Sequence, residues 1–128
     1  MYDEILQAVI AMASAAIGGK QILTGSIPPN NGIAMIGTSA PESIFLDIGS
    51  NERMSIVCKG KNTDQMAVIR QLDLIHHWLT RRKDFPSGDG WRIYSIETVA
   101  SPRYVGREAN SQWLYASSLL IKINTKGI

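Results

Sequence analysis

Two kinds of apolar periodicity alternate along this chain, and their order limits the folds open to it. The first is helical, with apolar side chains recurring one helical turn apart, and it occurs twice. One such segment, from about residue 2 to residue 17, carries Ile5, Leu6, Val9, Ile10, Ala13, Ala16 and Ile17. Gly18 and Gly19 follow it, as glycines follow a helix C-terminus. We therefore expect an N-terminal helix that buries one apolar face.

The second helical segment lies in the middle of the chain. Its apolar stripe consists of Val68, Leu72, Ile75 and Leu79, broadened by Met66, Ile69 and Trp78. Asn62 or Thr63 is expected to cap the helix, because both side chains can accept a hydrogen bond from the first turn. This segment predicts a second amphipathic helix that packs on the same core as the first.

The second periodicity has a period of two and predicts strands. It occurs over residues 33–37, 43–48, 54–59, 91–100 and 112–124. In the third of these strands Met54, Ile56 and Cys58 are expected on one face of the sheet. The turn before that strand is short, so an antiparallel hairpin is expected there. Residues 21–32 and 101–110 are expected to form loops, and the second loop is long for a hairpin.

This order of elements, α-β-β-β-α-β-β, predicts an α+β fold in which a small antiparallel sheet carries two helices on one face. The 128 residues fit a single domain over 1–128. Hydrophobic residues make up 45% and charged residues 19%, which excludes disorder as the global state. The single cysteine, Cys58, excludes an intrachain disulfide and is expected to be buried. Because the N-terminal apolar stretch is short and preceded by acidic residues, we expect no signal peptide and no membrane partner.

The residue patterns of common catalytic and cofactor sites are absent from the sequence. His76 and His77 are neighbours on a helix and point about 100° apart, so they do not converge on one metal ion. The Gly18-Gly19-Lys20 run lacks the spacing of a P-loop, and no Gly-x-Ser-x-Gly elbow occurs. We therefore expect a protein that is not an enzyme and has no catalytic residue, cofactor or metal.

Two groups of cationic residues are candidate binding sites. They are Arg81, Arg82 and Lys83 after the second helix, and Arg103, Tyr104 and Arg107 in the long loop. These side chains could be solvated, could contact phosphates with the tyrosine on a base, or could anchor a protein partner. Residues 61–128 carry ten basic and six acidic residues, a net +4, which is far from the dense basic stripe of a dedicated DNA-binding protein. The pattern favours a solvated surface first and a protein partner second.

The C-terminal half resembles a known family. From Trp91 to Ile123 a strand leads to a Pro-x-Tyr-x-Gly loop and then to a Trp-x-Tyr strand with alternating aliphatic residues. This run is similar to the end of bacteriophage minor capsid proteins related to tail terminators. The upstream order agrees, with an amphipathic first helix, a proline-containing loop, strands ending at Lys59, and a helix that opens with Asp64.

The resemblance implies a structural virion protein, present in the host cytoplasm during assembly, that forms a ring, commonly a hexamer, on the end of the tail tube. Such a ring stops tube polymerisation and prepares the joining of tail and head. Its implied partners are copies of itself, the major tail (tube) protein, a head-side neck protein and DNA passing through the channel. The implied contacts are axial loops with Pro28, Asn30 and residues 102–107, and a channel surface with Arg81, Arg82 and Lys83.

Two other functions are compatible with the same residues. A head-completion or neck connector protein would have a similar composition but would dock on the portal side. A nucleic-acid-binding α+β module would use the cationic residues on phosphates, with affinity that falls steeply as salt rises.

Overall fold

The structure is a computed structural model that describes residues 2–27, 31–37, 42–43 and 51–125. It contains two helices, α1 (Tyr2–Ala16) and α2 (Gln65–Thr80), as expected. The N-cap of α2 is Asp64, whose side chain accepts a hydrogen bond from the Met66 N–H at 3.1 Å. The expectation of Asn62 or Thr63 was wrong by one or two residues, because the Asn62 side chain instead accepts from the Asp64 N–H. Asp64 itself has the extended backbone that a cap requires.

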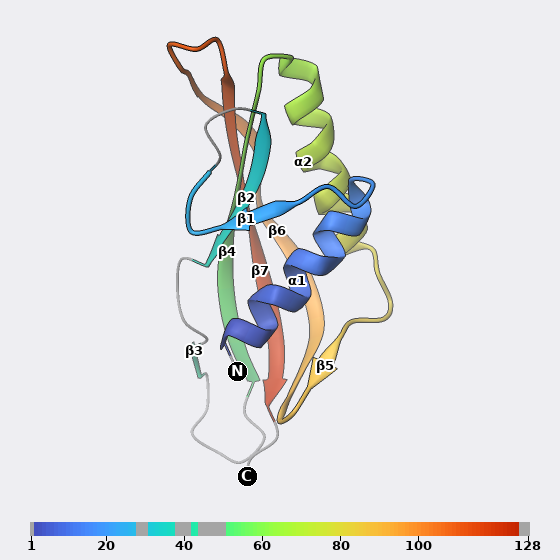
Figure 1. The fold of residues 1–128 in the computed structure, drawn as a ribbon. Coiled ribbons are helices and arrows are strands. Elements are labelled where there is room, and N and C mark those ends of the chain that lie inside the picture. Colours follow the sequence, from blue (N-terminus) through green and yellow to red (C-terminus); the bar gives the residue numbers. More distant parts are fainter. Residues whose placement is uncertain (1, 28–30, 38–41, 44–50, 126–128) are drawn as a thin grey trace.

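The strands form one sheet that curls into a half-barrel (Figure 1). They are β1 (Ile22–Thr24), β2 (Gly32–Gly37), β3 (Glu42–Ser43), β4 (Asn51–Asn62), β5 (Ser87–Gly88), β6 (Trp91–Arg107) and β7 (Trp113–Thr125). The order across the sheet is β1-β2-β4-β7-β6-β5, and β3 pairs with β4. All pairs are antiparallel except β1 with β2.

The predicted α+β class and the order of the main elements are confirmed, with β1 and β5 as short additions. The expected hairpin is present where Glu42 and Ser43 pair with Arg53 and Glu52 of β4. Residues 44–48 of the expected second strand lie outside the described residues. The strand expected over 54–59 is longer and spans the whole of β4.

The expectation of a long loop over residues 101–110 was wrong, because β6 continues through Pro102 to Arg107. Beyond Arg92, β6 is an edge strand among the described residues, because it pairs only with β7. An edge strand tolerates proline, since a residue there needs no backbone N–H on the side without a neighbouring strand. Register shifts between Ala100 and Arg103 absorb the proline as an irregularity. The connection to β7 is therefore short and begins only after Arg107.

Both helices cover one face of the sheet, and the core fills the space between the two layers (Figure 1). The sheet contributes alternate residues to this core: Ile33 and Met35 from β2, Met54, Ile56 and Cys58 from β4, and Leu119, Ile121 and Ile123 from β7. The helices contribute Ile5, Val9 and Ala13 from α1 and Val68, Leu72, Ile75 and Leu79 from α2. The apolar faces expected for β4 and for both helices are thus confirmed in their central residues. Each fully buried aliphatic side chain of this kind contributes about 1.5–3 kcal/mol. The broadening of the second stripe was wrong at Met66 and Trp78, which are exposed.

Neither helix in the described part of the chain is long and apolar enough to cross a membrane.

Candidate partner-binding surface

One end of the molecule gathers segments that are far apart in the sequence. Gln112, in the turn between β6 and β7, is only 2% exposed, and its side-chain oxygen accepts a hydrogen bond from the Asn31 N–H at 2.8 Å. The Asn31 side chain in turn accepts from the Thr63 N–H at 3.1 Å. Asn31 has a positive φ of 27°, which asparagine tolerates better than most residues. The β6–β7 turn, the start of β2 and the start of α2 are therefore tied together.

An ion pair strengthens the same end. Lys61, near the end of β4, is only 4% exposed and pairs with the Glu108 carboxylate that follows β6. Glu108 is held in turn by backbone hydrogen bonds, because its N–H donates to Gln112 and its carbonyl accepts from the Ser111 N–H, both at 2.9 Å. A buried ammonium needs such a partner, since an unpaired buried charge is strongly destabilising. The β6–β7 turn is thus a fixed structural element.

Aromatic and arginine side chains form a cluster beside this turn. The Tyr104 ring lies 6.0 Å from that of Trp113 and 5.8 Å from that of Tyr115, in tilted and edge-to-face geometries. The Arg107 guanidinium lies 4.7 Å from the centroid of the Trp113 ring. The Tyr115 hydroxyl accepts a 2.6 Å hydrogen bond from Gln65, which anchors the cluster to the first turn of α2. We call these four residues, Tyr104, Arg107, Trp113 and Tyr115, the terminal cluster.

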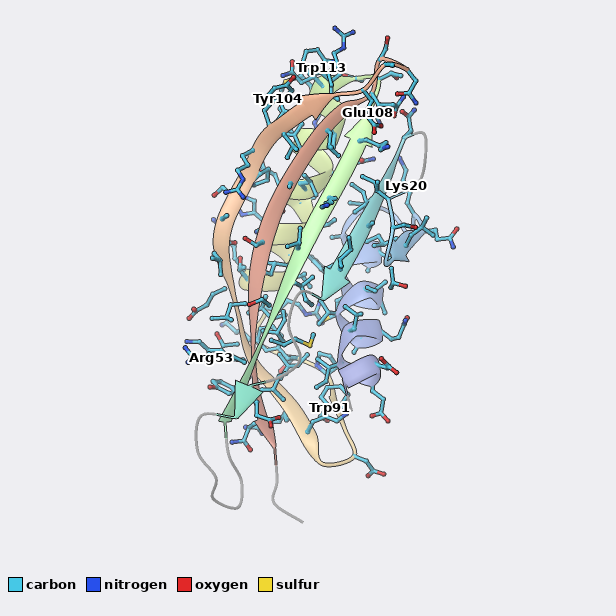
Figure 2. All side chains as sticks on the ribbon, turned by 90° about the vertical axis from the view of Figure 1, so that its left-hand side faces the viewer. Lys20, Arg53, Trp91, Tyr104, Glu108 and Trp113 are labelled. Atoms are coloured by element: carbon cyan, nitrogen blue, oxygen red, sulfur yellow. The ribbon has the colours of Figure 1, made fainter. Side chains whose placement is uncertain are left out.

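The terminal cluster has the composition of a protein-binding anchor. Tyr104 is 55% exposed although it contacts two other aromatic rings, so its position is fixed before any partner binds. Tyr, Trp and Arg are the residues that most often dominate protein interfaces. The Trp113 ring already contacts both Tyr104 and Arg107, so it is not a free platform for a nucleobase. The geometry therefore favours protein docking over base stacking. Figure 2 shows Tyr104 and Trp113 at the same end of the sheet as Glu108.

The structure separates residues that the sequence analysis grouped in one loop. Tyr104 and Arg107 lie opposite Tyr115 and Trp113 on the helix side of the sheet. Arg103 lies opposite Ala116, so it projects from the other face. Pro28 and Asn30 lie outside the described residues, but their neighbour Asn31 contacts Gln112 and belongs to the same end of the molecule.

Arg81, Arg82 and Lys83 lie at the other end of α2, about 24 Å from its start. The Arg81 N–H donates to the His77 carbonyl at 3.2 Å and closes the helix. The Arg82 guanidinium lies 5.2 Å from the centroid of the Trp78 ring and donates to the Asp84 carbonyl at 3.1 Å. These residues therefore form a surface distinct from the terminal cluster.

His76 is buried between α2 and the sheet, whereas His77 is exposed. The His76 ring nitrogens contact the Thr98 and Ser117 hydroxyls, both at 2.7 Å. Burial lowers the pKa of His76 from its ordinary value, with the nearby Asp73 carboxylate opposing this effect and His77 adding to it. A catalytic triad needs a carboxylate that is hydrogen-bonded to the histidine ring. Among the described residues both ring nitrogens contact hydroxyl groups instead, so His76 and Ser117 are not part of such a triad.

Cys58 is also buried, and burial raises the pKa of its thiol to about 12, against a smaller opposing effect of the Ser117 hydrogen bond. A thiol in this environment is protonated and unreactive at neutral pH. Within the described residues, moreover, no three histidine, cysteine or acidic side chains come together as metal ligands.

The stability of the protein is expected to fall as pH decreases below about 6.5, the ordinary pKa of histidine. Because the pKa of His76 is lowered by folding, the unfolded chain takes up its proton first, and acid therefore favours unfolding. Urea unfolding between about pH 7.5 and pH 5.5 should show a loss of up to about 1.4 kcal/mol per pH unit. His76→Gln should flatten this dependence, whereas His77→Gln should keep it. An unchanged pH dependence in His76→Gln would contradict the assignment.

The fold is a two-layer α+β domain with an aromatic and arginine cluster at one end. A sequence model of the family described as bacteriophage tail terminator protein matches residues 24–125. The chain therefore belongs to the bacteriophage tail terminator family, which makes it a structural protein of phage tails.

Comparison with solved structures agrees in fold. The chain is similar to a component of the virion of a native gene transfer agent particle, with a TM-score of 0.63 over 96% of this chain and 91% of that chain. The sequence identity is 14%, so this likeness concerns the fold alone. Among curated proteins no sequence matches the chain significantly.

Proposed function

We propose that this protein caps the tail tube, ends tube polymerisation and prepares the junction between tail and head, acting as a ring of identical copies. The family match over residues 24–125 carries this proposal. The fold shared with a chain from a gene transfer agent virion supports a place in a phage-like particle. The protein acts by binding and needs no catalytic group, cofactor or metal.

The terminal cluster and Asn31 beside it form the docking end in this proposal. Tyr104 and Arg107 are exposed, are held in place by their contacts and lie on the same end as Asn31. A fixed surface loses little conformational entropy when it binds, so it suits docking on a tube that presents a defined end. The major tail protein is the proposed partner there, with a head-side neck protein on the opposite side of the ring. The role of Arg81, Arg82 and Lys83 toward DNA in the channel stays a prediction.

Copies in the ring are proposed to meet through heterologous contacts, which close on themselves when each copy is rotated by the same angle. The exposed apolar side chains Leu74 and Trp78 on the outer side of α2 provide one surface for such contacts. The mass of the purified protein, measured with and without its tail tube, tests this arrangement. Ring formation on the tube end is the expected result.

Phage particles assembled without this protein are expected to carry overlong tail tubes, because no cap would stop polymerisation. Electron microscopy of lysates from a deletion and from a complemented strain measures the length distribution directly. Complementation with the native chain should restore a single tail length.

Tails of normal length that fail to join heads would contradict the capping role. That outcome would identify the protein as a neck connector, which docks after tail length is already set. Normal, joined tails in the deletion would exclude both assembly roles.

A further inference from the structure

The sheet face opposite the helices is not covered by any described helix (Figure 2). The outward residues of its three central strands are Arg53, Ser55, Val57, Lys59 and Lys61 from β4, Leu114, Ala116, Ser118, Leu120 and Lys122 from β7, and Arg92, Ser95, Glu97, Ala100 and Arg103 from β6. In β4 and β7 this orientation follows from alternation with the core residues of the same strand. In β6 it follows from the pairing of each residue with a residue of β7 on the same face. We call this surface the open face.

The open face has an excess of positive charge. The Glu97 carboxylate is engaged with Lys122 at 3.0 Å, and Lys61 is engaged with Glu108. Its other cations make no ion pair with a residue whose side chain the structure describes: Arg53, Lys59, Arg92 and Arg103. All four are exposed. Arg53 lies opposite Glu42 of β3 in the register of the sheet. This charge distribution suits a polyanionic partner, and it was not visible in the mild net charge of the whole chain.

The outward cations lie in two rows across the strands, with Arg92 opposite Asn124 and therefore just beyond the second row. Lys59, Ala116 and Arg103 lie side by side, which places the two cations about 10 Å apart at ~4.8 Å per strand. Arg53 lies opposite Lys122, about 20 Å further along β4 at ~3.3 Å per residue. The rows are therefore spaced on the scale of a nucleic-acid duplex, and a single small anion could contact only one row.

The floor between the rows consists mostly of uncharged side chains, and its acidic residue, Glu97, is paired with Lys122. Small side chains fill much of it, including Ser55, Ser118 and Ala100, with Val57 and Leu120 beside them. Small side chains let a backbone approach closely, and the Ser118 hydroxyl can donate to a phosphate oxygen. Between the two rows no register-paired outward residue of β4, β6 or β7 is aromatic, so the floor itself offers no stacking platform for bases. The exposed Tyr94 lies beyond the floor, at the irregularity between Ile93 and Ser95 of β6.

From these observations we infer that the open face binds the sugar–phosphate backbone of duplex DNA without sequence preference. The cations neutralise phosphates, and the small residues between them admit the backbone. This inference goes beyond the capping role and does not depend on it, because the terminal cluster lies on the helix side of the sheet and the open face is on the other.

The test is fluorescence anisotropy with a labelled duplex of about 20 base pairs and mixed sequence. If the four unpaired cations each neutralise one phosphate, the slope of log K against log salt is roughly −3.6. Affinity should then fall about 100-fold between about 50 mM and 200 mM salt. The double variant Lys59→Gln/Arg103→Gln should bind more weakly and reduce the slope to about −1.8.

The matched control is Lys20→Gln/Arg70→Gln, which removes the same charge from exposed positions on the helix side. It should retain the slope of the native chain, and circular dichroism melting should show that both variants stay folded. Equal loss of affinity in both variants would overturn the assignment to the open face. Absence of binding at about 50 mM salt would overturn DNA as the occupant and leave an acidic protein surface as the alternative. Neither result would alter tail length, so the capping role is judged separately.

Discussion

Replacing Gly60 with valine is expected to destabilise the fold by about 2–3 kcal/mol. Gly60 lies in β4 and faces Val68 and Leu72 of α2. A Cβ atom there would lie 2.7 Å from Val68 Cγ2 and 2.8 Å from Ile33 Cδ1, which is closer than real Cβ contacts. Both neighbours are β-branched and fully packed, so they cannot rotate away without disturbing the core. The midpoint and slope of urea unfolding measure the change.

Gly106→Val is the matched control for this prediction. Gly106 also lies in a strand, but a Cβ atom there would meet nothing within 4 Å. Both substitutions reduce the freedom of the unfolded chain and raise strand propensity, which is stabilising by up to about 1 kcal/mol. Only the Gly60 change adds a clash. Similar unfolding midpoints for the two variants would show that the packing of α2 on β4 does not limit stability.

The two periodicities predicted the layers of the fold because burial of a face leaves a local signal. Val68, Leu72, Ile75 and Leu79 recur with the helical repeat, and all four are buried in the structure. Alternation in β4 likewise assigned the inner face correctly. Such patterns depend only on neighbours along the chain, so a single sequence is enough to reveal them.

The errors arose where distant neighbours decide the local structure. Pro102 indicated a strand end, but an edge position and register shifts let β6 continue through it. Residues 22–24 looked like part of a loop, and they form β1 only because β2 offers a parallel partner. Asp64 replaced Asn62 as the helix cap because the Asn62 side chain turned to the Asp64 N–H.

The candidate surface was predicted in its residue types but not in its arrangement. Trp113 and Tyr115 are two residues apart in a strand, which alone indicates a shared face. Their contact with Tyr104 depends on the register shifts of β6. The spacing of residues in the sequence does not predict where such shifts occur. The hydrogen bond between Gln112 and Asn31 joins residues 81 positions apart, so the meeting of the two loops could not be read from either one.

Loss of the terminal cluster is expected to have the largest effect on function. The double variant Tyr104→Ala/Arg107→Ala removes an exposed aromatic ring and the cation beside Trp113 while leaving the core intact. Interface anchors of this kind contribute about 2 kcal/mol or more each, so tube binding should weaken at least about 30-fold per residue. Infectious particles should fall accordingly, and tails should lengthen. Plaque counts and electron microscopy of a complemented deletion strain measure both effects.

The comparison variant is Tyr94→Ala/Arg70→Ala, which removes the same side-chain types from exposed positions outside the cluster. If it lowers infectivity as much as the cluster variant does, exposure of aromatic and cationic residues in general matters and the cluster has no special role. Thermal unfolding separates binding from folding, because loss of an aromatic pair costs about 0.5–1.5 kcal/mol beyond buried area. A cluster variant that melts close to the native chain yet leaves tails overlong would place the contact with the tube at Tyr104 and Arg107. Normal tail length in a folded cluster variant would instead move that contact to another surface of the ring.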